Sequence, residues 1–204
     1  MSDPSSWRVT THDWTRGVDL DHLEALRDRS GNAAAGGRRH LILEVLAYAD
    51  EEAASLGRVG TAVVTTHADG RVTIADDGRG TDTRRDAAGR VIRKPVMATA
   101  DVRFLDRSTA PSLPDGLPRR GMSSVAGVSS ELVHENHRET GSWSQSYRFG
   151  VPDRELVEVA ARGGSGTTVS FRTEVPGPPD LGEADLIGFP WLRIELRMET
   201  APRA

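Results

Sequence analysis

The sequence predicts an α+β fold in which helices pack on one face of a mixed, mostly antiparallel sheet. Helical periodicity is concentrated before Gly57, whereas strand-like alternation dominates after Ser142. The chain has 204 residues, of which 37% are apolar, and this is enough for one domain of ordinary size with a buried core. We therefore expect a two-layer sandwich.

Two helices are expected near the start of the chain. Asp19 is a suitable N-cap and Gly31 a suitable stop for the first. The second runs over about residues 39–56, because Leu41 and Val45 recur on one stripe with further apolar residues. The residues before the first helix are polar and aperiodic, as is typical of a terminal arm.

A hairpin follows the helices. Residues 61–66 are rich in Val and Thr, residues 67–70 have turn chemistry, and residues 71–75 alternate again. Residues 81–120 are irregular and contain three prolines that exclude a long helix, so we expect a large surface loop there, with a lid at about 105–121.

The rest of the chain favours strands after one short helix at about 122–132. Strand-like segments are expected at 142–149, 155–160, 167–175 and 191–198. No internal repeat is present. We therefore predict an N-terminal arm over 1–18 and a single domain over 19–204.

Composition excludes several classes of protein. No run of 18 uncharged apolar residues occurs, and the first 15 residues lack the apolar core of a signal peptide, so we expect a cytoplasmic protein with no membrane partner. The absence of cysteine excludes disulfides, thiolate metal sites and thiol nucleophiles. A net charge of -4 argues against unaided adsorption to nucleic acid, so DNA would be contacted only locally or through a partner.

The most specific short segment is Asp76-Asp77-Gly78-Arg79-Gly80, which stands at the end of a predicted strand. A carboxylate at a strand end can accept a hydrogen bond from an exocyclic amine, and glycines let a planar ring or a phosphate approach the backbone. Adenine meets this description. On these five residues alone, an ordinary Asp-Gly turn is an equally good interpretation.

Two further features carry candidate chemistry. Glu44 shares a helix face with Tyr48 and Glu51, and a buried glutamate facing a ligand could act as a general base towards water. Taken alone, a solvated helix charge is the commoner interpretation. Thr167 follows a glycine-rich turn and enters a strand, where its hydroxyl could approach a ligand or simply belong to a hairpin.

The order and spacing of these three features resemble the ATP-binding domain of the DNA gyrase B protein. That domain belongs to the GHKL superfamily of gyrase, chaperone, histidine kinase and mismatch-repair ATPases, whose domain is the Bergerat fold. The resemblance spans most of the chain. The segments that carry it are 40–45, 50–53, 67–69, 72–80, 103–106, 147–152, 166–167 and 191–197.

The resemblance implies roles at the base end of a nucleotide site. Asp76 would accept the adenine amine, Gly78 would line the same pocket, and Thr167 would support the base through water. Arg79 would stack against the base and Arg138 would flank it. These two arginine roles rest on the resemblance alone.

The resemblance also implies roles at the phosphate end. Glu44 would be the general base for hydrolysis of the γ-phosphate, and Gly80 and Gly121 would lie beside the nucleotide. The family's Gly-Leu-His-Gly-Val-Gly lid is replaced here by a segment in which Arg119 and Arg120 precede Gly121. The two guanidinium groups could hold phosphates by charge, although a solvated basic loop is the commoner interpretation.

The largest departure from the family is Tyr48, which occupies the position of the asparagine that ligates Mg²⁺. A neutral phenol is a poor ligand for this ion, so we expect no metal ligand here and ATP or ADP binding with slow or absent hydrolysis. A non-catalytic interaction or regulatory module and a protein-kinase-type relative are the alternatives. The sequence contains no counterpart of a transducer or DNA-cleavage region, so we expect a partner protein or a homodimer.

Overall fold

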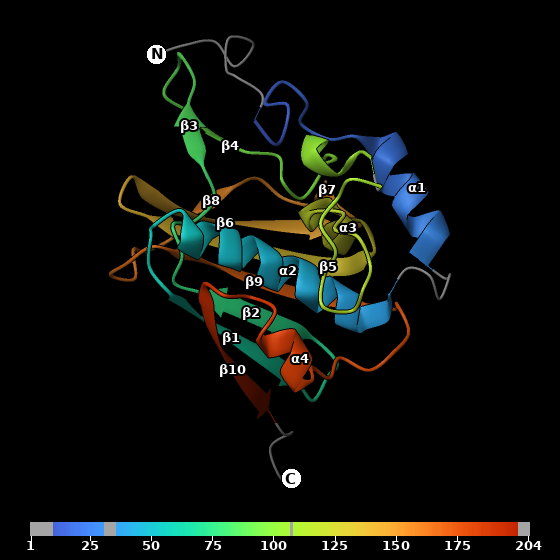
Figure 1. Ribbon diagram of the computed structural model, residues 1–204. Coiled ribbons are helices and arrows are strands. Elements are labelled where there is room, and N and C mark those ends of the chain that lie inside the picture. Colours follow the sequence, from blue (N-terminus) through green and yellow to red (C-terminus); the bar gives the residue numbers. More distant parts are fainter. Residues whose placement is uncertain (1–9, 31–35, 107, 200–204) are drawn as a thin grey trace, which may run out of the picture.

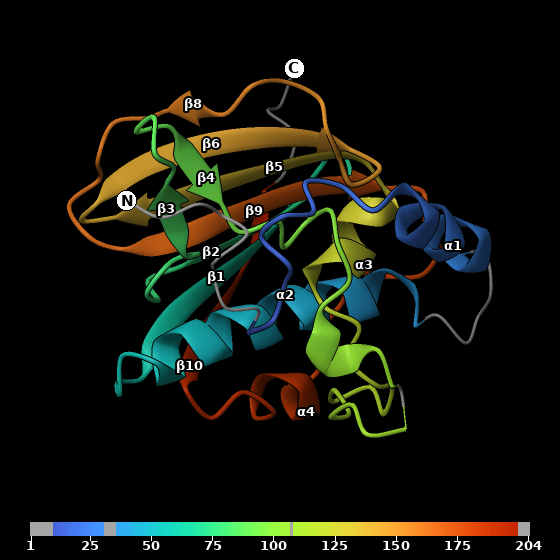
Figure 2. The same cartoon turned by 90° about the horizontal axis from the view of Figure 1, so that it is seen from above.

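The computed structural model describes residues 10–30, 36–106 and 108–199. Within these residues the chain forms an α+β sandwich, which confirms the predicted fold class. Figures 1 and 2 show the sheet as one layer, with α2, α3 and α4 on the same side of it. The first half of the predicted arm and the proposed stop at Gly31 lie outside the described residues.

The described helices are short apart from the second. They are α1 (Leu20–Ser30), α2 (Gly37–Ala54), the 3-10 turn η3 (Val102–Phe104), α3 (Met122–Gly127) and α4 (Glu183–Leu186). Asp19 caps α1 as predicted, because its carboxylate accepts the His22 backbone N–H at 3.1 Å. The second helix has nearly the expected limits, and eleven of its residues are buried.

The main sheet has eight strands in the order β10-β1-β2-β9-β5-β6-β7, with β8 also paired to β6. Its strands are β1 (Gly60–His67), β2 (Val72–Asp76), β5 (Ser129–Arg138), β6 (Gly141–Arg148), β7 (Val151–Pro152), β8 (Val157–Glu158), β9 (Gly166–Thr173) and β10 (Leu192–Glu199). All neighbours are antiparallel except β1 and β10. A separate hairpin joins β3 (Thr83–Arg85) to β4 (Val91–Arg93).

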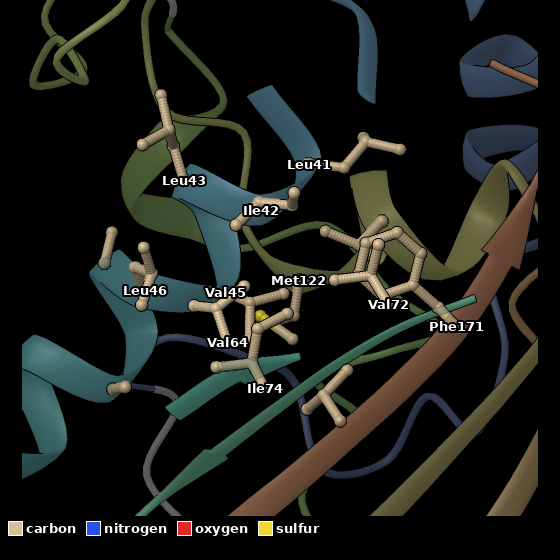
Figure 3. Close-up of a cluster of buried hydrophobic side chains, with 14 of the residues drawn as sticks. Leu41, Ile42, Leu43, Val45, Leu46, Val64, Val72, Ile74, Met122 and Phe171 are labelled. Atoms are coloured by element: carbon tan, nitrogen blue, oxygen red, sulfur yellow. The ribbon is translucent and has the colours of Figure 1, made fainter. Parts of the chain in front are cut away.

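The core lies between α2 and the sheet. Leu46 of α2 and Ile74 of β2 are almost completely buried in one apolar cluster, together with Phe171 of β9. Figure 3 shows these side chains meeting between the helix and the strands. Because α2 is buried over most of its length, its polar residues are fixed against the sheet or the loops above it.

Three sequence-based assignments need correction. The helix predicted over 122–132 ends at Gly127, because Leu132 pairs with Tyr147 and Phe171 as part of β5. This tertiary pairing decides the conformation over local preference. The strand predicted over 155–160 is only the two residues of β8. Residues 81–120 are not wholly a surface loop, since they contain β3, β4 and buried core residues near Met97.

Among the described residues, no helix is both long enough and apolar enough to cross a membrane. This finding concerns helices alone. The predicted limits of the arm, the domain and the lid stay predictions.

Candidate functional site

The carboxylate of Asp76 is buried at the end of β2. Its Oδ1 accepts the Gly78 backbone N–H at 2.8 Å, and its Oδ2 accepts a short hydrogen bond from the Thr167 hydroxyl of β9. Burial raises the pKa of Asp76 above its ordinary value, and the two hydrogen bonds oppose that rise. The structure therefore brings two of the predicted residues, Asp76 and Thr167, into direct contact across neighbouring strands.

Glycine is required where β9 passes the end of β2. A Cβ at Gly166, whose φ is +140°, would lie 2.0 Å from the Asp76 carbonyl oxygen. At Gly78 a Cβ would lie 2.9 Å from the Asp76 carboxylate and from Glu52 of α2. Close backbone packing of this kind leaves no room for a side chain, so the position of Asp76 is fixed by the backbone around it.

A chain of hydrogen bonds continues from this point through Thr81. The Thr81 N–H donates to Asn136 Oδ1 at 2.6 Å, and its hydroxyl lies 2.7 Å from the Tyr48 hydroxyl. The same hydroxyl lies 3.3 Å from Nε2 of His134, which packs edge-on against Trp143. Burial lowers the pKa of His134 to about 3 and raises that of Tyr48 well above its ordinary value, so both are neutral.

The two arginines assigned to the base end have partners within the protein. Arg79 Nε donates to Glu52 at 2.9 Å, and its side chain is substantially exposed. Arg138 lies 3.3 Å from the Asp82 carboxylate and 3.5 Å from the carbonyl of Gly80. Arg138 therefore contacts the loop that follows Asp76, and Arg79 contacts the acidic helix.

Glu44 lies at the other end of the site and is completely buried. Its Oε1 accepts the Arg120 backbone N–H at 2.5 Å, and its Oε2 accepts the Gly121 N–H at 3.1 Å. His40 Nε2 lies 3.4 Å from Oε1, and Arg119 Nε lies 3.9 Å from Oε2. The interpretation of Glu44 as a solvated helix charge is therefore wrong, because residues 119–121 cover it.

Arginine side chains join residues 105–121 to the acidic face of α2. Arg119 forms a short ion pair with Glu51, whose carboxylate also accepts Arg103 at 3.0 Å and 3.2 Å. The guanidinium groups of Arg119 and Arg103 lie 4.6 Å and 4.8 Å from the ring centre of Phe104. The interpretation of Arg119 as a solvated loop cation is wrong, because its side chain is only 8% exposed.

His40 connects the start of α2 to the same loop. Its Nδ1 lies 2.8 Å from the carboxylate of Asp115. Burial lowers the pKa of His40, but the hydrogen bond to Asp115 and the nearby Glu44 carboxylate outweigh burial, so the net shift is upward. Asp115 and Arg119 thus anchor the loop to one face of α2 by two different kinds of charged contact.

A cavity of about 310 Å³ opens beside these groups. Tyr48 and Arg79 line one part of it, and Arg119 and Gly121 line another. The other lining residues are Thr11, His12, Glu51, Glu52, Ala54, Asp82, Lys94, Val96, Asp101, Arg103 and Met122. The predicted residues Glu44, Asp76 and Thr167 are not part of this lining, although Tyr48 and Glu52 bring the cavity close to Asp76.

Sequence reasoning did not select several residues of the cavity wall, above all His12 and Lys94. His12 lies in the predicted arm and Lys94 in the segment interpreted as a surface loop, so neither belongs to a motif. Glu51 and Arg103 appeared only as parts of segments that carry the resemblance. Within the part of the chain that the structure describes, no three His, Asp or Glu side chains gather closely enough to hold a metal ion.

No family model matches the chain. Searches of curated proteins nevertheless find relatives. The chain is 30% identical over 175 residues to the novobiocin-sensitive DNA gyrase B protein of Streptomyces niveus, and the alignment covers 83% of the chain and 25% of that protein. It is 35% identical over 156 residues to the DNA gyrase B protein of Mycobacterium tuberculosis, covering 74% of the chain and 23% of the relative.

A third relative is the B component of DNA topoisomerase 4 from Staphylococcus epidermidis, which is 29% identical over 161 residues. That alignment covers 76% of the chain and 24% of the relative. The chain therefore spans about a quarter of the length of the curated relatives it matches. The similarity concerns one part of those proteins.

Proposed function

This chain is a gyrase B-like domain, and on that premise we propose that it binds ATP or ADP and hydrolyses ATP slowly or not at all. The adenine would be held at Asp76, in the cleft between the acidic helix and β9. Residues 105–121 would act as the lid over the phosphates. The observation that carries the proposal is the contact between Asp76, Gly78 and Thr167 across β2 and β9.

Several features support binding of the base near Asp76. A carboxylate oxygen has two lone pairs, so Oδ1 and Oδ2 can each accept a further hydrogen bond after those from Gly78 and Thr167. The backbone close to Asp76 is held by Gly166 and Gly78, which keeps the acceptor in one position. Arg79, on the cavity wall, offers a planar guanidinium to an aromatic base.

The slow hydrolysis follows from how Glu44 is held. Both of its oxygens already accept backbone N–H groups, from Arg120 and Gly121. Hydrogen bonds to a carboxylate stabilise its charged form and weaken it as a base. A general base also needs a water within hydrogen-bond reach, and Glu44 is not on the cavity wall.

Magnesium does not fit the residues at its expected position. Tyr48 presents a buried neutral phenol whose oxygen already bonds the Thr81 hydroxyl at 2.7 Å. Mg²⁺ prefers carboxylate, carboxamide and water oxygens in tight octahedral geometry. We therefore derive no catalytic step through a metal and expect nucleotide binding to depend little on Mg²⁺.

Calorimetric titration with ATP and ADP, in the presence and absence of Mg²⁺, tests the binding. We expect Asp76→Asn to weaken both nucleotides and adenosine by about tenfold, because a charged acceptor for the adenine amine is lost. Asp69→Asn is a matched control, since Asp69 is an exposed carboxylate in the turn between β1 and β2. Absence of binding heat for both nucleotides in the unchanged protein would disprove the assignment.

Phosphate release tests the catalytic part. If Tyr48 limits hydrolysis, Tyr48→Asn will raise the rate in the presence of Mg²⁺, and adding Glu44→Ala will remove the gain. A brisk rate in the unchanged protein would contradict the proposal of slow hydrolysis. A non-catalytic regulatory module stays the alternative function, and the covered position of Glu44 favours it.

We further propose that the nucleotide signal is read by a protein partner or by a second copy of the chain. The relatives are named as parts of DNA gyrase and DNA topoisomerase 4, so DNA would be reached through that partner. The net charge of -4 is consistent with indirect contact. Size-exclusion chromatography with light scattering, with and without ATP, tests whether the partner is a second copy.

A further inference from the structure

Lys94 is the only lysine among the 26 lysine and arginine residues of the chain. It follows β4 and is tied to the loop after Asp76, because its backbone N–H donates to the Asp82 carbonyl at 3.2 Å. Its side chain is partly buried and lines the 310 Å³ cavity. A chain that otherwise uses arginine throughout therefore places its single ammonium group at the candidate site.

Lys94 differs from the arginines of the same cavity in having no carboxylate partner. Arg79 pairs with Glu52, and Arg103 and Arg119 both pair with Glu51. Across residues 10–30, 36–106 and 108–199, no carboxylate lies within ion-pair distance of the Lys94 ammonium.

The carboxylates nearest to Lys94 already have other partners. Asp82, Asp101 and Glu52 are the ones whose charge acts on it, raising its pKa against the lowering by burial. Asp82 pairs with Arg138, Asp101 with Arg103, and Glu52 with Arg79. The ammonium of Lys94 is therefore the cation of this cavity that is available to an anion from outside.

His12 provides a second unused group on the same wall. Its ring is 3% exposed, its Nδ1 lies 3.0 Å from the Thr11 hydroxyl, and its Nε2 has no hydrogen-bond partner in the described chain. Burial is the main cause that lowers its pKa to about 4, and the charges of Lys94 and Arg103 contribute. The ring is therefore neutral and close to both cations. When Nδ1 accepts the Thr11 hydroxyl, Nε2 carries the proton and is a donor.

The position of His12 is fixed by backbone contacts. The Val102 N–H donates to the Thr11 carbonyl at 2.9 Å, and the Asp19 N–H donates to the Ala98 carbonyl at 2.9 Å. These bonds hold residues 11–19 against the segment that leads from Lys94 to η3. A buried donor without a partner is costly, so Nε2 points to a bound group that would accept its hydrogen bond.

We propose that Lys94 and His12 form an anion subsite that takes a phosphate group of the bound nucleotide. This inference rests on the proposed function for the identity of the ligand. An ammonium is a compact charge suited to a single phosphate oxygen, and a neutral imidazole N–H adds a directed hydrogen bond. The subsite uses residues outside every motif that carries the resemblance, and it supplies positive charge where Tyr48 leaves no metal ligand.

The single lysine makes a direct test possible. Reductive methylation with ¹³C-formaldehyde keeps the charge and gives one dimethyl-lysine signal, which Lys94→Met identifies by its loss. We expect ATP and inorganic triphosphate to shift this signal, whereas adenosine leaves it in place. Equal shifts with adenosine, or none with ATP and triphosphate, would overturn the subsite.

Calorimetry supplies the matching affinities. Lys94→Met should weaken ATP about tenfold or more, as for loss of one charge-assisted hydrogen bond, and Lys94→Arg should recover part of the loss. His12→Phe should weaken ATP in the same direction, whereas His12→Gln keeps a donor and should lose less. Circular dichroism and thermal unfolding establish that each variant is folded. Unchanged ATP affinity in Lys94→Met, or in both His12 variants, would overturn the inference.

Adenosine separates this inference from the proposed function. If adenosine does not bind but triphosphate shifts the lysine signal in the unchanged protein, the nucleotide assignment fails and the anion subsite stands. If adenosine and ATP bind with equal affinity and Lys94 does not respond, the base assignment stands and the subsite fails. Arg58→Met is a suitable charge control, because Arg58 pairs with Asp77 on an exposed surface away from the cavity wall.

Discussion

The two ends of the candidate site are held by different kinds of interaction. At the Asp76 end, two strands approach so closely that only glycine fits at position 166, and the contacts are short, neutral or buried. At the Glu44 end, Asp115 and Arg119 fasten a loop to α2 through charged side chains. Backbone packing cannot rearrange locally, whereas ion pairs can exchange partners. The base end is therefore built to be rigid and the loop end to be adjustable.

The largest expected effect comes from removing the glycine at the rigid end. Gly166→Ala places a Cβ 2.0 Å from the Asp76 carbonyl oxygen at a φ of +140°, and we expect it to lower the free energy of unfolding by roughly 3 kcal/mol or more. Urea denaturation measures the loss. Gly163→Ala, at a positive φ with open space around it, should cost only about 1 kcal/mol. Equal costs for the two variants would remove the claim of rigidity.

The next effect is a difference in pH dependence between the two ends. The folded pKa of His134, about 3, lies below its unfolded value near 6.5, so the unfolded state binds more protons and stability falls as the pH falls from 6.5 towards 3. Between pH 7 and pH 5 this costs about 2 kcal/mol for one histidine. His134→Leu should remove that part of the acid sensitivity in urea titrations at the two pH values.

His40, at the loop end, should act with the opposite sign. Its folded pKa is raised, so its contribution is fully present below the unfolded pKa and is lost as the pH rises through the folded pKa. The variant His40→Gln should therefore lose more stability on acidification than the unchanged protein does. If both histidine variants change the acid sensitivity in the same direction, the contrast between the two ends is wrong.

The smallest expected effect is at the adjustable end. Arg119→Met removes the cation that pairs with Glu51, but Arg103 still binds that carboxylate at 3.0 Å, and Glu44 keeps its backbone donors. We expect a loss of about 1 kcal/mol in urea denaturation. The exposed arginine of the Arg58–Asp77 pair is the control, and Arg58→Met should stay within about 0.5 kcal/mol. A loss larger than that of Gly166→Ala would reverse the comparison.

The same contrast explains what could be predicted from the sequence. The hairpin before Asp76, the long buried helix and the glycine turn before Thr167 have strong local patterns, and the structure contains each of them. The contacts between Asp76 and Thr167 join segments that the resemblance had already paired. Whether those residues bind a nucleotide stays a prediction.

What could not be predicted depends on pairing between distant segments. Leu132 has a helix-like neighbourhood but joins a strand, because β6 and β9 flank it. His12 and Lys94 carry no motif, and only the folded chain places them on one cavity wall. The covering of Glu44 by residues 119–121 was equally hidden, since a helix pattern gives burial of a face but not the loop that lies over it.

The distance along the chain between β2 and β9 has a consequence for biosynthesis. The hydroxyl that bonds Asp76 lies 91 positions later, and β1 receives its parallel neighbour only from β10. While the ribosome is still making the last third of the protein, the earlier strands have an unpaired edge. Premature termination before Gly166 would therefore yield a chain that contains the conspicuous Asp-Gly motif but cannot complete the cleft.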